Sequence, residues 1–117
     1  MRWDEEESLD LQSTVEKVKP TVLLGLTGVG GIFGEETIRT MSANVEKPII
    51  FPLSNPTSSA ECTAEQAYEW SSGRCVFASG SPFQPVEYEG KTLRPSQCNN
   101  MFVFPGVGLG ATLVRAR

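Results

Sequence analysis

Runs of apolar residues, separated by polar segments, divide the chain into predicted strands and helices. Residues 21–26 form a nearly continuous apolar run, which is typical of a strand buried on both faces of a parallel sheet. The runs at 48–53 and 74–79 predict two more strands. Helical spacing of the apolar residues predicts a helix over 35–45, and a second helix runs from 63 to about 71.

A short helix is predicted near the N-terminus. Leu11, Val15 and Val18 fall on one stripe of this helix, and Ser8 is a candidate N-cap. Pro20 ends the helix because it disfavours helical geometry at the residue before it.

The last third of the chain predicts a hairpin and a final helix. Residues 86–88 and 91–93 lie on either side of Glu89-Gly90, as in a small hairpin outside the sheet. A Gly- and Ala-rich helix then begins at Phe104-Pro105-Gly106, with the proline near its first turn. Alternating strands and helices indicate an α/β fold with right-handed crossovers. We therefore predict part of a doubly wound, Rossmann-like parallel sheet with a small β-hairpin excursion.

Charge is concentrated at the start of the chain. The first 16 residues carry six acidic groups and one basic group, and the whole chain of 117 residues has a formal net charge of −4. We expect an acidic segment over residues 1–15 and a near-neutral globular body over 16–117. Since there is no basic block, a nucleic-acid or anionic-lipid partner is not expected. No apolar run approaches the ~20 residues that cross a bilayer.

Histidine and cysteine content excludes several kinds of site. The chain has no histidine, which rules out a Ser-His-Asp triad, a Cys-His pair and a histidine-liganded zinc in this sequence. The three cysteines, Cys62, Cys75 and Cys98, contain no Cys-x-x-Cys pair. We expect reduced, mostly buried thiols in an intracellular protein.

Carboxylates do not predict a metal site. Glu61 and Glu65 flank the start of a predicted capping box formed by Thr63 and Gln66, and they are interpreted as a solvated helix start. No aspartate follows Asp10, so a hard-metal site built from Asp and Glu is not located in this chain.

A glycine-rich loop after the first predicted strand is the first candidate for ligand binding. Backbone N–H groups in such a position can cradle a phosphate. However, Gly28 and Gly30 are followed by Phe33 where the Gly-x-Gly-x-x-Gly fingerprint needs its third glycine. A tight turn is therefore the preferred interpretation, and a pyrophosphate site is the alternative.

Asparagines at predicted strand ends are the second candidate. Asn55 follows the second strand at its carboxyl end, where ligands bind in open α/β sheets. Asn99 and Asn100 precede an apolar segment and can present amide donors and acceptors to a pocket. Ordinary turn chemistry is the alternative for each of these residues.

Taken in order, several segments resemble the malic enzymes, and the resemblance runs from about residue 16 to residue 111. The segments that carry it are Val18–Gly25, Ile49–Thr57, Ala60–Glu65, Gly73–Phe83 and Gln97–Asn100, leading into Phe104–Val107. Residues 85–92 are most similar to the NADP-dependent enzymes of plants, and Ser96 departs from the glycine of many members.

The resemblance implies oxidative decarboxylation of L-malate to pyruvate and CO2, with NAD or NADP as hydride acceptor and Mg²⁺ or Mn²⁺ as required metal. It places this chain in the later part of the NAD(P)-binding domain. The lysine base, the tyrosine acid, the metal ligands and the main dinucleotide fingerprint of the family precede the matching segment. The chain is thus expected to supply no catalytic residue and no metal ligand, and to act as a fragment.

The resemblance also implies roles for particular residues. Asn55, Asn99 and Asn100 match substrate-binding asparagines of the family. The residues expected to line the cofactor are Thr27, Gly28, Val29, Leu53, Ser54 and Asn55. The family relation implies a homo-oligomeric parent enzyme in the cytoplasm or an organelle. The alternative function is a non-catalytic nucleotide-binding or interaction module.

Overall fold

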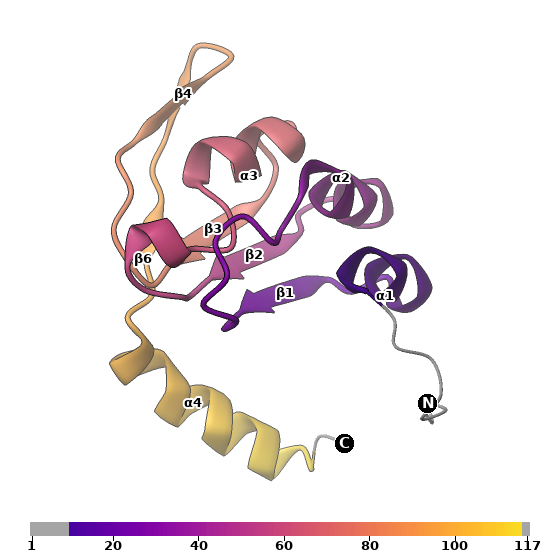
Figure 1. The fold of residues 1–117 in the computed structure, drawn as a ribbon, viewed down its shortest axis with the longest axis vertical. Coiled ribbons are helices and arrows are strands. Elements are labelled where there is room, and N and C mark those ends of the chain that lie inside the picture. Colours follow the sequence, from indigo (N-terminus) through magenta and orange to yellow (C-terminus); the bar gives the residue numbers. More distant parts are fainter. Residues whose placement is uncertain (1–9, 116–117) are drawn as a thin grey trace.

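The computed structural model of the protein describes residues 10–115 (Figure 1). The helices of the described chain are α1 (Leu11–Val18), α2 (Glu35–Asn44), the 3-10 turn η1 (Thr57–Ser59), α3 (Ala64–Trp70) and α4 (Asn100–Leu113). The strands are β1 (Val22–Gly25), β2 (Ile49–Pro52), β3 (Val76–Ser79), β4 (Val86–Tyr88), β5 (Lys91–Leu93) and β6 (Ser96–Gln97).

The main sheet has four parallel strands in the order β1-β2-β3-β6, and β4 and β5 form a separate antiparallel hairpin. This architecture confirms the predicted α/β class with a hairpin excursion. The sequence did not predict β6, in which Ser96 and Gln97 pair with Ala78 and Ser79. Two residues of polar sequence carry no strand periodicity, so pairing with β3 alone defines this strand.

One face of the sheet is packed against the helices. Leu23, Ile50 and Phe77 lie in register across β1, β2 and β3. These side chains contact a core that also includes Ile38 of α2 and Tyr68 of α3. Full burial of one such side chain contributes about 1.5–3 kcal/mol. The helix-facing row is therefore the main source of stability for the sheet.

The opposite face of the sheet is open in the described chain. Val22, Ile49 and Val76 form the next row in register, and Val22 and Val76 are 43% and 48% exposed. Leu24 of β1 is also exposed. The prediction that the first strand is buried on both faces is therefore wrong for these residues, because no described helix packs on this side (Figure 1).

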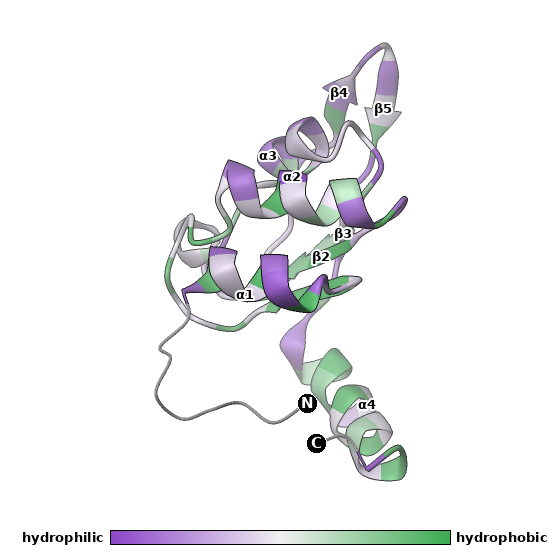
Figure 2. Ribbon diagram, turned by 90° about the vertical axis from the view of Figure 1, so that its right-hand side faces the viewer, coloured by the Kyte–Doolittle hydropathy of each residue, from purple (hydrophilic) through white to green (hydrophobic). Residues whose placement is uncertain are grey.

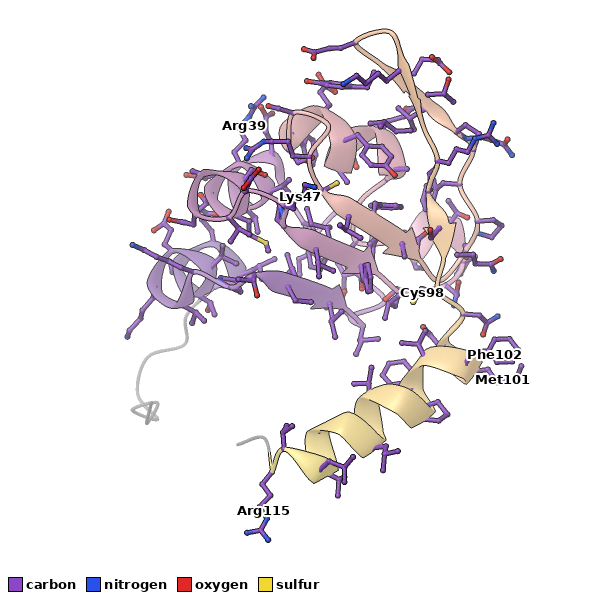
Figure 3. The ribbon with its side chains drawn as sticks, turned by 180° about the vertical axis from the view of Figure 1, so that it is seen from behind. Arg39, Lys47, Cys98, Met101, Phe102 and Arg115 are labelled. Atoms are coloured by element: carbon purple, nitrogen blue, oxygen red, sulfur yellow. The ribbon has the colours of Figure 1, made fainter. Side chains whose placement is uncertain are left out.

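α4 is an apolar helix that stands apart from the sheet (Figure 2). It begins at Asn100 and not at Phe104, because the Asn99 side chain caps it by accepting a hydrogen bond from the Met101 N–H at 3.0 Å. Pro105 consequently lies inside the helix, where its missing N–H removes one backbone hydrogen bond. Met101 and Phe102 point outward and are 70% and 75% exposed (Figure 3).

At α1, the predicted end agrees with the structure, and the N-cap is a different residue from the candidate. α1 is capped by Asp10, whose Oδ1 accepts from the Ser13 N–H at 2.7 Å, and the proposed cap Ser8 lies outside the described residues. The helix ends at Val18 before Pro20, as predicted.

The capping box and the hairpin turn were predicted correctly. Thr63 Oγ1 accepts from the Gln66 N–H at 3.2 Å, and the Gln66 side chain accepts from the Thr63 N–H at 2.9 Å. Glu89 and Gly90 both have positive φ, 46° and 75°, as the two central residues of a tight hairpin turn require.

The open apolar face predicts self-association of the isolated chain. Exposed apolar side chains favour association between copies of the chain, and they include Val22, Leu24 and Val76 on the sheet and several residues of α4. In addition, β1 is an edge strand that is available for pairing. We expect sedimentation velocity to show a concentration-dependent increase in mass at micromolar chain. A monomer with a sharp, cooperative unfolding transition would contradict this prediction.

Candidate functional site

The loops that follow the parallel strands meet at the carboxyl edge of the sheet. The loop after β1 approaches the segment after β2, where the Gly28 N–H donates to Ser54 Oγ at 2.9 Å. The start of α4 joins the same edge, because Asn100 Nδ2 donates to the Leu53 carbonyl at 3.0 Å. Most of the residues singled out from the sequence therefore lie within one region, at the edge where open α/β sheets bind their ligands.

Glu61 connects the loops after β1 and β2. Its side chain is fully buried, with 0% exposure. Its Oε1 accepts hydrogen bonds from the Thr27 N–H at 2.8 Å, from Thr27 Oγ1 at 3.0 Å and from Ser54 Oγ at 2.5 Å. The interpretation of Glu61 as part of a solvated helix start is therefore wrong. The hydrogen-bond donors of the two loops turn this carboxylate inward.

The Glu61 carboxyl is ionised at neutral pH. Burial is the largest single influence on its pKa and raises it. The hydrogen bonds from Ser54 and Thr27 stabilise the charged form, and together they leave the pKa below its ordinary value. A permanent negative charge therefore lies beneath the loop after β1.

The backbone of residues 27–29 is directed toward this charge. The Thr27 N–H donates to Glu61, the Gly28 N–H donates to Ser54 Oγ, and the Val29 N–H donates to Thr27 Oγ1 at 3.1 Å. These three N–H groups are therefore occupied within the chain. None of the three is left to bind a phosphate, which favours the tight-turn interpretation of this segment.

Asn55 lies at the end of β2 and is exposed. Its Oδ1 accepts a hydrogen bond from Ser81 Oγ at 2.5 Å, so it is held against the segment after β3. A Cβ built on Gly80 would overlap the backbone carbonyl of Leu53 and would lie 2.9 Å from Asn55 Nδ2, so only glycine permits this approach. Asn55 and its neighbours after β3 thus form one continuous polar surface.

Asn99 and Asn100 have different surroundings. Asn99 caps α4 with its side-chain oxygen, as described above. Asn100 points toward β2, and its Oδ1 is buried without a hydrogen-bond partner among residues 10–115. An unpaired buried amide oxygen is unfavourable, so Asn100 is the member of the pair with a binding capacity that the described chain leaves unused.

The entire chain, residues 1–117, matches the family described as malic enzyme, NAD binding domain. The chain belongs to this family. It is 61% identical over 107 residues to the NADP-dependent malic enzyme of Dictyostelium discoideum, covering 92% of this chain and 20% of the relative. It is 62% identical over 103 residues to the chloroplastic NADP-dependent malic enzyme of Zea mays, covering 88% of this chain and 16% of the relative. The chain thus spans a fifth or less of the length of these two relatives.

Membership of the malic enzyme family confirms the resemblance found in the sequence. Of the residues that the resemblance assigned to cofactor and substrate, Thr27 and Ser54 are hydrogen-bonded to Glu61, and Asn100 is bonded to Leu53 at the same sheet edge. The sequence analysis did not predict the burial of Glu61, which the structure places between two other buried residues, Ala60 and Cys62.

The described part of this family member holds no metal-binding cluster. Across residues 10–115, no group of three or more His, Cys, Asp or Glu side chains is arranged to hold a metal ion. Cys62, Cys75 and Cys98 are free, and burial raises the pKa of the Cys62 thiol to about 12. That thiol is therefore protonated at neutral pH. None of the described helices is long and apolar enough to cross a bilayer.

The packing of Glu61 predicts a large effect of Gly25→Ala. A Cβ on Gly25 would overlap the carboxyl group of Glu61, so that group must move. Inserting a methyl group into such a packed site costs about 1–3 kcal/mol. We expect Gly25→Ala to lower the urea concentration at the midpoint of unfolding, compared with the unsubstituted chain at the same chain concentration. The matched control is Gly108→Ala, whose Cβ would meet no atom within 4 Å. Equal midpoints for the two variants would contradict the prediction.

Proposed function

We propose that this chain is part of an oxidoreductase that oxidatively decarboxylates L-malate to pyruvate and CO2 while NAD(P) is reduced. The proposal is supported by the family and by the names of the relatives, which are NADP-dependent malic enzymes. In this proposal the chain supplies substrate and cofactor contacts only. The observation that carries it is the buried amide oxygen of Asn100 at the carboxyl edge of the sheet, which has no hydrogen-bond partner among the described residues.

Asn100 is proposed to bind the substrate. The Leu53 carbonyl uses one hydrogen of Nδ2 and thereby fixes the orientation of the amide. The second Nδ2 hydrogen and Oδ1 are then the groups that remain for a ligand. An N–H of this kind suits a malate carboxylate, and the oxygen suits a hydroxyl donor. Asn99 is proposed to contribute through its place beside Asn100, and its side-chain oxygen is already used as a helix cap.

Asn55 is proposed to lie between substrate and cofactor. It is exposed at the end of β2, and Ser81 holds its Oδ1, so its Nδ2 is the group directed to a ligand. Leu53 and Ser54 directly precede Asn55 and are proposed to line the cofactor site with it. Both of these residues are buried.

Residues 27–29 are proposed to face the cofactor. Their N–H groups are turned toward Glu61 and Ser54, so this loop presents carbonyl groups and α-carbons outward. Such a surface fits a part of NAD(P) that carries no phosphate, such as the nicotinamide riboside, whose ring is cationic in the oxidised cofactor, better than it fits a phosphate. When bound, NAD(P) would accept the hydride; the residues of this chain would bind and orient the reactants.

A divalent metal does not fit the donor set of the described residues, 10–115. Their carboxylates and thiols form no cluster of three, and Glu61 Oε1 already accepts hydrogen bonds from Thr27 and Ser54. We propose that Mg²⁺ or Mn²⁺ is held by residues of the parent enzyme that lie outside this chain.

The family relation also supports three coarser proposals. We propose a homo-oligomeric parent enzyme, an intracellular location, and no nucleic-acid or membrane partner. The Zea mays relative is named chloroplastic, and the Dictyostelium discoideum relative carries no such word in its name.

A chimaeric enzyme tests the function. The segment of the Zea mays malic enzyme that this chain matches is replaced by the corresponding residues of this chain, and NADP-dependent pyruvate formation from malate is measured. We expect kcat/KM within tenfold of the Zea mays enzyme. A folded chimaera that binds NADP and does not turn over malate would refute the proposal and would favour a non-catalytic nucleotide-binding or interaction module.

A further inference from the structure

We propose that Glu61 is a positioning residue: its buried carboxylate holds the loop after β1 and Ser54 in the arrangement that Asn55 and the cofactor require. This inference rests on the proposed function and names a residue that acts through its neighbours. It does not assign Glu61 any contact with substrate or cofactor.

The segment around Glu61 binds the loop after β1 through main chain as well as side chain. The Glu61 carbonyl accepts from the Phe33 N–H at 2.9 Å, and the Ala60 carbonyl accepts from the Gly31 N–H at 3.1 Å. The side chain adds the two bonds to Thr27. The glycine-rich loop is therefore attached to residues 60 and 61 at several points along its length, so a shift of Glu61 moves the whole loop.

The carboxylate also determines the orientation of Ser54. The Ser54 hydroxyl donates to Glu61 Oε1, which leaves its lone pairs to accept from the Gly28 N–H. The Ser54 N–H is 3.4 Å from Glu61 Oε2. Because Asn55 is the next residue, a change in Ser54 is transmitted directly to the Asn55 backbone. Glu61 thus joins two loops that come from different strands.

Charge is required for this arrangement because one oxygen accepts three hydrogen bonds. A carboxylate oxygen is a stronger acceptor than an amide oxygen, and hydrogen bonds to it are shorter and stronger. Burial of a charge is unfavourable by itself, so hydroxyl and N–H donors must compensate for it. A neutral glutamine at this position would keep the shape, weaken all three bonds and place an N–H₂ group near the Ser54 N–H.

The test uses the chimaeric enzyme described above with three variants. Glu61→Gln removes the charge at nearly constant volume, Ser54→Ala removes the hydroxyl that Glu61 orients, and both are combined in a double variant. Glu65→Gln is the matched control, because Glu65 is exposed in the first turn of α3, four residues further along the chain. Kinetics with malate are measured at a concentration of active sites determined by NADP titration.

We expect Glu61→Gln to lower kcat/KM for malate at least tenfold and to raise KM, while Glu65→Gln changes neither by more than twofold. A purely structural role would reduce the number of folded enzyme molecules and leave the KM of the remainder unchanged. The double variant is expected to be little worse than Glu61→Gln alone, because the two groups act through one hydrogen-bonded unit.

Two results would overturn the inference while the proposed function stands. One is an active chimaera in which Glu61→Gln leaves KM and kcat per active site unchanged. The other is a double variant whose loss in kcat/KM equals the product of the losses from Glu61→Gln and Ser54→Ala, because independent effects multiply. An unsubstituted chimaera that binds NADP without turning over malate would instead refute the proposed function, and this inference with it.

Discussion

The purified 117-residue chain, supplied with L-malate, NADP and Mg²⁺ or Mn²⁺, is expected to form no pyruvate above the uncatalysed rate. The chain has no histidine, and its described part has no cluster able to hold a metal. The residues proposed here bind and orient ligands, and each loss of about 1.4 kcal/mol in transition-state stabilisation lowers a rate tenfold. The resemblance places the metal ligands, the lysine base and the tyrosine acid before this segment, so we expect the chain alone to lose many orders of magnitude in rate. A lactate dehydrogenase-coupled assay of pyruvate measures the result.

The active chimaera is the positive control for this assay, since it contains the same segment in a longer enzyme. Preparations of the chain from a host strain that lacks its own malic enzymes exclude contamination. Metal-dependent pyruvate formation by such a preparation would show that a complete catalytic site lies within these residues, and the assignment of the chain to a binding role would be wrong.

Most of the fold could be predicted because its elements are local. Apolar runs and helical spacing gave the strands β1, β2 and β3 and the helices α2 and α3. Thr63 and Gln66 predicted the correct first residue of α3, because both partners of the capping box lie within one turn. These features depend on neighbouring residues in the sequence, which is where pattern analysis is most reliable.

The errors arise where distant or unexpected contacts decide the structure. β6 exists only because two polar residues pair with β3, and no local pattern marks them. α4 begins at Asn100 because an asparagine side chain caps it, which outweighs the preference of Pro105 for a first turn. The open row at Val22 and Val76 could not be predicted either, because a continuous apolar run looks the same whether one face or both are covered.

The candidate site was predicted in part, by residue type and position on the strands. Asn55 and Asn100 follow or approach the carboxyl ends of strands, where ligands bind in such sheets. Glu61 was missed because an acidic residue near a helix start is usually solvated. Its burial depends on Thr27 and Ser54, which lie 34 and 7 residues away in sequence, so only the folded chain reveals the hydrogen-bonded unit.

Substitution of Asn100 is expected to give the largest loss among single residues of the proposed site. Its amide is proposed to bind the malate carboxylate, and a hydrogen bond to a charged group contributes about 1.5–3 kcal/mol. Asn100→Ala in the chimaera should therefore lower kcat/KM for malate by roughly tenfold to more than a hundredfold. Asn100→Asp should be at least as damaging, because it places a negative charge against that of the substrate. Steady-state kinetics over a range of malate concentrations measures both variants.

Affinity for NADP without malate separates this role from a cofactor contact. It is expected to change little in Asn100→Ala, because the carboxylate that Asn100 binds is absent from the binary complex. Asn44→Ala is the matched control: Asn44 ends α2, at a distance from the carboxyl edge of the sheet, and its amide bonds only the Thr40 carbonyl. If Asn100→Ala weakened NADP binding and left malate kinetics unchanged, the assignment to substrate would be wrong. Asn100 would then be a cofactor or turn element, and Asn55 would be the proposed residue left to contact malate through a free side-chain donor.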